Sequence, residues 1–323
     1  MRKVAITAAE FLLLSVLLEI NIGCGGSTGR SSLAPGTPSS PVPTSPSTSS
    51  PAQPPMAAFI ETAGYGQSEI YTVTNDGTGF TKVSARPGEF RSVYVLPDGS
   101  KGVFAAPLAP GEYSQIFYLA PFNSTATPIQ LTTTSEDKTS PMLSADGNQI
   151  TFALKRPVQP DPEFVISDIA VMNVDGSDLH VVEAPAGWTF SHPFLSPDGN
   201  KITGQMDTGW FGDSAIFVMN ADGTDLARLT PAGANSILAL TPAFSPNGKQ
   251  IVFGSLGWGD FGLYVINVDG TGLQRVGERD AGWADPLFVN DRIMFLFDNE
   301  IYSMKTDGTD VKRITNNTSK DWF

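Results

Sequence analysis

Short apolar runs broken by polar turns dominate the chain from Met56 onward, and few stretches have the period of an amphipathic helix. One pattern reads as strand, tight turn and strand. Each full copy contains Asp-Gly or Asn-Gly, a hairpin signal because the favoured two-residue turns need positive φ at both central residues. The pattern therefore predicts β-hairpins. The copies span 93–104, 142–152, 194–204 and 243–253, with a shortened copy at 287–295.

A second pattern, an apolar strand followed by a polar turn, alternates with the first. Its turn glycines Gly176, Gly223 and Gly270 recur every 47 residues, and Gly308 follows after 38. One copy has lost its Asp-Gly turn and has a longer loop. This period fits one four-stranded blade per repeat, so residues 56–323 are predicted to form an all-β, six-bladed β-propeller. The six copies begin at Ile70, Ile116, Ile169, Ile216, Leu263 and Ile301.

The two ends of this region predict how the ring closes. The first repeat begins at Met56 with AAFIET and lacks an innermost strand, whereas the chain ends in TSKDWF, which matches the start of that strand. We therefore expect the C-terminal strand to complete the first blade. Closure of this kind removes free sheet edges, which otherwise invite aggregation.

The two motifs closely resemble the repeats of the TolB family, periplasmic proteins in which SPDGxxIxF alternates with IYxxxxDGTxxxRLT. The resemblance covers residues 56–323. It implies a six-bladed propeller outside the cytoplasm that engages protein partners across its face and has no chemistry of its own. TolB also carries an N-terminal α/β domain, where this chain has a Pro/Ser-rich segment, so the resemblance does not extend to a role in a Tol-Pal system.

The N-terminal residues 1–23 have the organisation of a signal peptide. Arg2 and Lys3 precede the apolar run 11–18, and glycines surround Cys24. Cys24 is the only cysteine, and its place after the apolar run resembles the lipidated cysteine of bacterial lipoproteins. We expect a lipid anchor that holds the protein to a bacterial membrane, in the periplasm or at the cell surface.

Two other interpretations of this segment stay open. An uncleaved transmembrane helix would bury Glu10 and Glu19, at about 2–3 kcal/mol for each carboxylate. The second interpretation is ordinary secretion without lipidation, because Asn21 stands where lipoproteins usually have leucine. Residues 24–55 are rich in Pro, Ser and Thr, with few apolar side chains to offset the entropy lost on ordering, and are predicted to be an extended tether.

Composition excludes several functions. The net charge is −13 and no Lys/Arg cluster occurs, which argues against nucleic acid. Two histidines and one cysteine supply neither a serine-hydrolase centre, a zinc cluster nor the several histidines of a metal-dependent propeller lyase. We expect no cofactor, no metal and no catalysis. A glycosidase with paired carboxylates remains an alternative, with candidates Asp207, Asp213, Asp260, Asp280 and Asp285.

The candidate site lies on the face opposite the Asp-Gly turns, because the loops there hold all five tryptophans. Trp188, Trp283 and Trp322 precede innermost strands, where packing between blades is an alternative to binding. Trp210 and Trp258, with Phe211 and Phe261, lie in Gly- and Asp-flanked loops typical of interfaces. The predicted binding face comprises Trp188, Trp210, Phe211, Trp258, Trp283, His192 and Asp285.

One residue from the mouth of each innermost strand is expected to rim the axial tunnel. Among these, His192 suits a metal ion or a ligand carboxylate, although a hydrogen-bonded structural histidine is the alternative, and the same holds for Asp285. The rim residues are Ser92, Ser140, His192, Thr241, Asp285 and Phe323.

The outer turns carry D-G-[ST]-D, as in residues 175–178, 222–225 and 307–310. This string resembles part of a calcium loop but lacks the distal bidentate glutamate, so a turn capped by aspartate is preferred. Together these features predict a monomeric, membrane-tethered module that binds a protein or a glycan of the cell envelope.

Cys24→Ser tests the predicted anchor. The variant lacks the lipid-accepting thiol, so we expect it to move from the membrane fraction to the soluble fraction on cell fractionation. Continued membrane association of the variant would instead favour an uncleaved N-terminal helix.

Overall fold

The computed structural model describes residues 56–64, 67–74, 76–77, 79–84, 89–122, 126–157, 165–208, 214–231, 239–257, 260–277, 285–289, 291–298 and 300–315. The predicted signal peptide, Cys24, the tether and the closing C-terminal strand lie outside these residues. Within the ranges given, no helix has the length and hydropathy needed to span a bilayer.

The described residues form six antiparallel sheets, one with three strands and five with four. The first three sheets in chain order contain β1 (Met56–Gly64), β2 (Gln67–Thr74), β3 (Thr81–Lys82); β4 (Ser92–Val95), β5 (Gly102–Pro107), β6 (Ser114–Leu119), β7 (Ile129–Gln130); and β8 (Asp137–Leu143), β9 (Gln149–Pro157), β10 (Val165–Asn173), β11 (His180–Val182). The last three contain β12 (Thr189–Leu195), β13 (Lys201–Asp207), β14 (Ser214–Asn220), β15 (Ala227–Arg228); β16 (Ala239–Phe244), β17 (Gln250–Gly257), β18 (Asp260–Asn267), β19 (Gln274–Val276); and β20 (Leu287–Val289), β21 (Arg292–Phe297), β22 (Glu300–Lys305), β23 (Lys312–Arg313).

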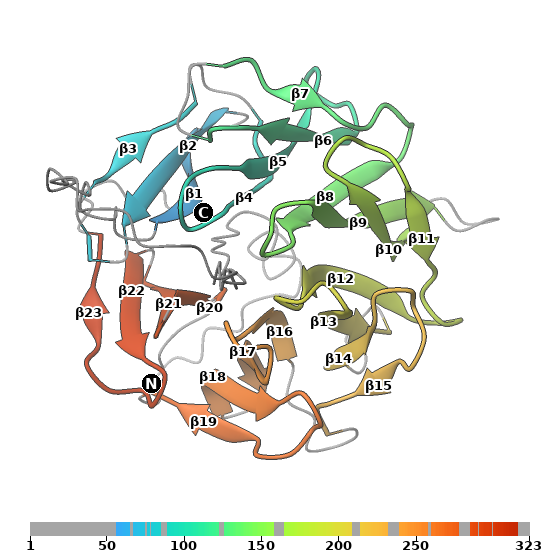
Figure 1. The fold of residues 1–323 in the computed structure, drawn as a ribbon. Coiled ribbons are helices and arrows are strands. Elements are labelled where there is room, and N and C mark those ends of the chain that lie inside the picture. The colour runs from blue at the N-terminus through green and yellow to red at the C-terminus, as the bar shows by residue number, and fades with distance from the viewer. Residues whose placement is uncertain are drawn as a thin grey trace, which may run out of the picture.

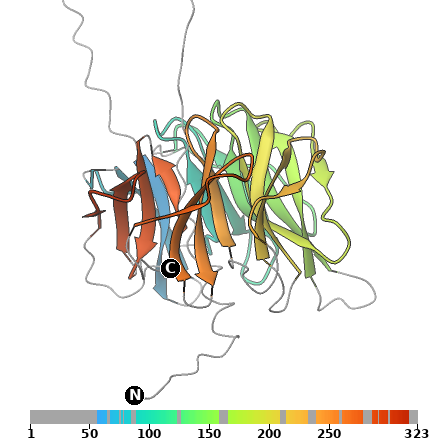
Figure 2. The same ribbon diagram turned by 90° about the horizontal axis from the view of Figure 1, so that it is seen from below.

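The sheets stand around a central axis as the blades of a propeller (Figure 1). Within each four-stranded blade the strands pair in chain order, with β4, β8, β12, β16 and β20 nearest the axis. Seen from the side, the ring is a thick disc (Figure 2). The six-bladed propeller predicted from the repeats is therefore confirmed.

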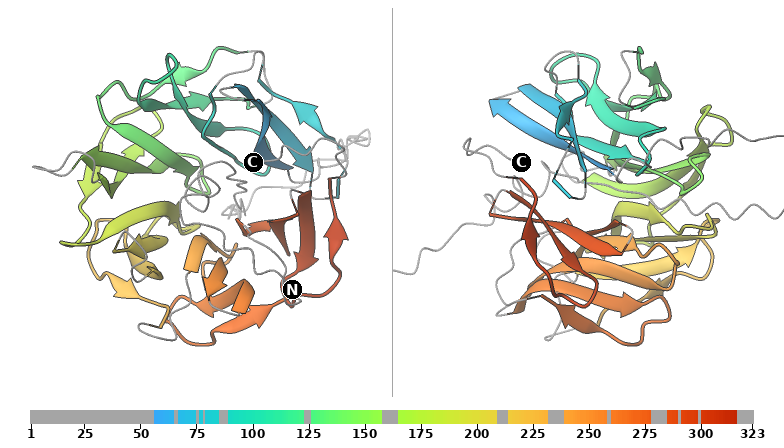
Figure 3. Two further views of the ribbon diagram at one scale, coloured as in Figure 1. Left: turned by 180° about the vertical axis from the view of Figure 1, so that it is seen from behind. Right: turned by 60° about the vertical axis from the view of Figure 1, so that its left-hand side comes forward.

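The first and last blades are neighbours, which Figure 3 shows from two further directions. A Cβ placed on Gly77, in the turn after β2, would lie 3.1 Å from the carbonyl oxygen of Ile314, which follows β23. The first sheet has three strands in the described residues, in line with the expected missing innermost strand. Completion of that blade by the C-terminal residues stays a prediction.

The inner hairpins use a different turn from the predicted one. In each of them only the glycine has positive φ, between 65° and 72° at Gly99, Gly147, Gly199 and Gly248. The amide of Gly147 donates to the Ser144 carbonyl at 2.8 Å. Asp146 keeps negative φ, and its Oδ1 accepts the Asn148 amide at 3.0 Å. The expectation of positive φ at both central residues was wrong, because the Asp or Asn caps the backbone of a wider turn instead.

The aspartates of the outer turns are hydrogen-bonded within the turns themselves. Oδ1 of Asp175 accepts the Ser177 amide at 2.9 Å and the Ser177 hydroxyl at 2.6 Å. The hydrogen bond from the hydroxyl is the main reason that the pKa of Asp175 lies below its ordinary value. Asp222, Asp269 and Asp307 make the same pair of bonds to the Thr two residues on. These contacts support the turn interpretation over a calcium loop.

Both kinds of turn lie on one face of the disc, as predicted. In the third blade the Val174 amide donates to the Asn148 carbonyl at 3.0 Å and so joins the outer turn to the inner one. The fourth and fifth blades repeat the bond, from Ala221 to Asn200 and from Val268 to Lys249. We call this side the turn face. The opposite side, where the chain passes between the second and third strands and on to the next blade, is the loop-rich face.

Apolar packing between blades forms the core. The largest cluster of buried side chains includes residues of all six sheets, from Phe59 in β1 to Met304 in β22. Polar staples join neighbouring blades near the loop-rich face. The Ser214 hydroxyl donates to the Ala239 carbonyl at 2.9 Å, and the Ser167 amide donates to Oγ1 of Thr189 at 2.8 Å. The blades thus form one interlocked ring.

The second blade, which lacks the Asp-Gly outer turn, uses a phenylalanine in its place. Phe122 is 1% exposed, and its amide donates to the Gly99 carbonyl at 3.0 Å. A Cβ on Gly102 would lie 1.9 Å from Cδ2 of Phe122. Phe122 therefore packs back onto the blade, and Gly102 makes room for its ring.

Gly102→Ala is expected to lower the free energy of unfolding by about 1–3 kcal/mol, because the added methyl forces the Phe122 ring out of its site. Thermal melts measure the loss. The exposed loop substitution Glu112→Ala serves as control and should leave the melting temperature unchanged. Equal melting temperatures for Gly102→Ala and wild type would show that the Phe122 ring can shift to accommodate the methyl group at little cost.

Candidate functional site

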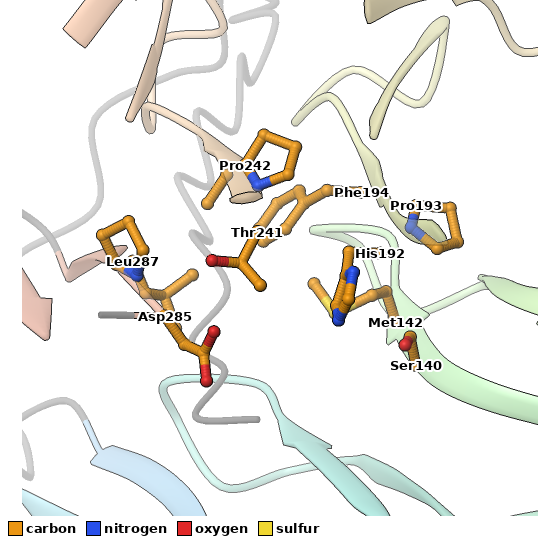
Figure 4. Close-up of a pocket in the computed structure, with 11 residues that line it drawn as sticks. Ser140, Met142, His192, Pro193, Phe194, Thr241, Pro242, Asp285 and Leu287 are labelled. Atoms are coloured by element: carbon orange, nitrogen blue, oxygen red, sulfur yellow. The ribbon is translucent and has the colours of Figure 1, made fainter. Parts of the chain in front are cut away.

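Four consecutive blades each bring an X-Pro pair to the axis. Ser140-Pro141 lies in β8, His192-Pro193 in β12, Thr241-Pro242 in β16, and Asp285-Pro286 just before β20. Their side chains surround a cavity of about 40 Å³ (Figure 4). Three of the prolines also line it, and the remaining lining residues are Met142, Phe194, Ala243 and Leu287.

The backbone in front of the proline is strained at three of these positions. Ser140, His192 and Thr241 have φ of 54°, 50° and 45°. At each, the register with the second strand of the blade shifts, as between Ser191 and Phe194. A proline cannot donate to the sheet, and a bulge at that point turns the preceding side chain away from the regular ladder. The same costly conformation thus recurs at one level of the ring.

The structure brings together the described residues that the sequence predicted to rim the axial tunnel. Ser140, His192, Thr241 and Asp285 line the cavity. Ser92 is buried beside them, and its Oγ accepts the Ser140 amide at 3.1 Å. Phe323 lies outside the described residues. That His192 or Asp285 binds a ligand stays a prediction.

His192 is electrically neutral at physiological pH. Burial is the main cause that lowers its pKa from 6.5 to about 4, and the charge of Lys155 adds to the effect. The ammonium of Lys155 lies 3.9 Å from Oδ2 of Asp137, which also lies 3.6 Å from Arg91. The imidazole therefore offers one N–H donor and one nitrogen acceptor.

Asp285 is shifted in the opposite sense. Burial raises the pKa of its carboxyl from 3.8 to about 7, and a hydrogen bond with Thr241 offsets a smaller part of that rise. In Figure 4 the oxygens of Asp285 and Thr241 face the same space, with His192 across from them. The narrow, mostly apolar cavity thus holds one acidic group that sits near the midpoint of its titration at neutral pH.

Sequence reasoning missed the apolar part of this site. Met142, Phe194 and Leu287 each come two residues after the polar rim residue of their strand. The repeated spacing, in which an apolar residue comes directly after each X-Pro pair, was a usable signal.

Of the predicted aromatic binding residues, the structure describes the side chain of Trp188. Trp188 is partly buried and packs against a core cluster that contains Ile169 and Phe190, which supports its role in packing between blades. Trp210, Phe211, Trp258, Trp283 and Trp322 lie outside the described residues, as does the side chain of Phe261. Their place in binding stays a prediction.

A different set of exposed apolar residues lies on the loop-rich face. Leu108 and Tyr113, in the loop between β5 and β6, are 62% and 57% exposed, and Val165 at the start of β10 is 49% exposed. The sequence PLAPGEY forms this loop and contains no tryptophan, so it was not among the predicted binding residues. Together with the axial cavity, this loop makes the described part of the face suited to contact with another molecule.

Only some of the candidate catalytic groups lie in the described part of the chain. Among the residues whose side chains the structure places, no three of His, Cys, Asp or Glu are arranged to hold a metal ion. His180 lies on the outer strand β11, where a ring nitrogen is 3.3 Å from the Ala221 carbonyl. Asp213, Asp280 and the side chain of Asp260 lie outside the described part of the chain. Asp285 is the one carboxylate among the cavity-lining residues.

Asp285 predicts an unusual pH dependence of stability. Between pH 3.8 and about 7 the unfolded chain ionises this carboxyl while the folded protein keeps it protonated, so stability falls as pH rises. Asp285→Asn cannot ionise. It should melt close to wild type at pH 4 and about 2–4 °C or more above it at pH 8.

His192→Gln provides the matched comparison. The folded-state pKa of His192 is depressed, so wild type gains stability as pH rises from about 4 to 6.5, and the variant should lose that gain. Melting curves at pH 4, 6 and 8 separate the two effects. A difference between Asp285→Asn and wild type that stays constant with pH would contradict the buried position of the carboxyl.

Comparison with known proteins shows the fold alone. No family model and no curated protein matches the chain. A TolB-type protein of Agrobacterium tumefaciens aligns with a TM-score of 0.60 and 20% identity over 78% of this chain and 90% of its own. TolB of Acinetobacter baumannii has a TM-score of 0.56 and 17% identity, and the alignment covers 79% of this chain but 62% of that one.

Enzymes share the architecture as well. Hydrazine synthase of Kuenenia stuttgartiensis aligns with a TM-score of 0.62 and 14% identity over 83% of this chain and 46% of its own. Fold likeness at such identities does not decide between binding and catalysis. The chain thus has a six-bladed β-propeller of the type found in TolB.

Proposed function

We propose that this protein is a binding module outside the cytoplasm, tethered to a membrane through its N-terminus, that engages a protein of the cell envelope through its loop-rich face. The propeller itself performs no chemistry in this proposal. A glycan of the envelope is the other class of partner for the same face.

The different use of polar groups on the two faces carries the proposal, because exposed apolar side chains occur on both, with Leu179 on the turn face. On the turn face, aspartates such as Asp175 and Asp222 are bonded within their own turns. On the loop-rich face, Leu108 and Tyr113 expose apolar surface on a loop, and the axial cavity presents the strained residues His192 and Thr241. Exposed aromatic and aliphatic side chains beside a concave centre are typical of protein interfaces.

Two further observations support this function. The repeat motifs resemble those of TolB, whose family engages protein partners outside the cytoplasm. The signal-peptide pattern of residues 1–23, Cys24 and the Pro/Ser-rich segment up to residue 55 are suited to a folded module held at a distance from a membrane.

The enzymatic alternative is a glycosidase that uses carboxylates of the same face. Asp285, with its raised pKa, has the protonation that a general acid needs. The reaction also needs a second carboxylate, and the other described lining residues of the cavity supply none. Since about 10–15 Å³ suffices for one water, a cavity of about 40 Å³ has room for a few heavy atoms rather than for a saccharide ring. Binding is the better-supported function.

The paired substitution Leu108→Ser with Tyr113→Ser tests the proposed face. Capture of envelope proteins by the immobilised full chain should fall at least about fivefold, because the exposed apolar contact is lost while the core is untouched. Quantitative mass spectrometry of the captured proteins measures the change, and thermal melts confirm that the fold is retained.

Leu179→Ser is the matched control, since Leu179 is 53% exposed but follows an outer turn on the opposite side of the disc. The control should capture as wild type does. Trp210→Ala with Trp258→Ala enters the same assay, and a loss of capture without loss of stability is expected. Equal capture by the loop-rich and control variants would show that Leu108 and Tyr113 do not belong to the interface.

A further inference from the structure

We propose that the axial cavity receives a primary ammonium group, the end of a lysine side chain that the protein partner inserts from the loop-rich face. This inference rests on the proposed function and names the chemistry of the contact at its centre. The feature that carries it is a small cavity that holds one carboxyl, several other hydrogen-bond acceptors and an apolar part of its lining.

The backbone of the cavity wall lacks amide donors at three points, because prolines follow its polar residues. Pro193, Pro242 and Pro286 have no N–H, so the backbone offers no amide to the cavity at these points. The carboxyl of Asp285, the hydroxyls of Ser140 and Thr241, and one imidazole nitrogen of His192 are all able to accept. A ligand that brings its own donors fits this wall, and an ammonium brings three.

The charges around the cavity favour a cation over an anion. Asp285 is the one acid among the lining residues, and His192 carries no charge at neutral pH. The nearby cation Lys155 already has Asp137 as its counter-ion, at 3.9 Å. The whole chain has a net charge of −13, which attracts a basic partner surface. A carboxylate ligand would face Asp285 without a compensating cation among the lining residues.

The apolar lining selects the kind of cation. Met142, Phe194 and Leu287 stand beside the polar groups and contact a hydrocarbon stem better than a hydrated ion. A divalent metal needs more ligands than one histidine and one carboxylate, and the described side chains include no third of these types in range. A lysine side chain combines the methylene stem and the compact charge that the cavity requires.

The position of the cavity allows entry from the proposed interface. Ser140, His192 and Thr241 lie two to three residues from the strand ends at the loop-rich face, where β8 begins at Asp137, β12 at Thr189 and β16 at Ala239. At about 3.3 Å per residue this places them roughly 7–10 Å along the strands from that face. His192, Thr241 and Asp285 are partly exposed among the described residues.

The first experiment uses n-butylammonium chloride, a lysine side chain without its backbone, with the full chain at pH 7.5. The methyl resonance of Met142, assigned with Met142→Leu, should shift saturably in methionine-methyl NMR spectra. Sodium butyrate and n-butanol at equal concentration should leave it unmoved. Asp285→Asn should weaken n-butylammonium binding at least about tenfold, because the desolvated charge pair is lost.

Asp98→Asn is the control, since Asp98 caps a turn on the opposite face by accepting the Ser100 amide, a role that asparagine retains. It should bind n-butylammonium as wild type does. No saturable shift in wild type, or equal binding by Asp285→Asn and wild type, overturns the inference. Asp285→Asn is expected to fold well, so its loss of binding is informative.

The second experiment separates this inference from the proposed function. Envelope extract is divided, the lysines of one half are acetylated, and both halves are passed over immobilised full chain and its Asp285→Asn variant. Partner capture that is lost on acetylation and reduced at least fivefold in Asp285→Asn supports both proposals. Capture that is lost with Leu108→Ser and Tyr113→Ser but unaffected by acetylation and by Asp285→Asn retains the binding module and overturns the lysine contact.

Discussion

Packing between blades is the interaction on which the whole structure depends. A sheet of short strands cannot bury both of its faces by itself, so each blade needs the two beside it. The buried cluster that runs from Phe59 to Met304 through all six sheets shows this mutual dependence. Staples such as Ser214 to Ala239 and the contact of Gly77 with Ile314 hold the blades in place.

The same arrangement creates the axial site. When the innermost strands converge on an axis, residues far apart in sequence come to share one small space. Ser140, His192, Thr241 and Asp285 meet there because each precedes a proline at the same level of its strand. Removal of water then makes His192 a weaker base and Asp285 a weaker acid. The chemistry of the cavity is thus a consequence of ring geometry and desolvation.

The two faces of the disc use their side chains differently. The turn face uses its polar groups locally, as the bonds of Asp146 and Asp175 show, and so stabilises the hairpins. The loop-rich face leaves Leu108 and Tyr113 exposed in the loop between β5 and β6. Propellers of the same architecture occur in TolB and in enzymes, so the fold alone does not decide the function of this chain.

Local patterns in the sequence are enough to predict the number of blades, the position of their hairpins and the level of the rim residues. Each of these depends on local signals repeated at a fixed spacing, such as Asp146-Gly147 and Asp198-Gly199. The apolar lining from Met142 and Phe194 and the pKa shift of Asp285 depend instead on how the blades come together. These features arise from contacts between blades and from exclusion of water, which no single repeat contains.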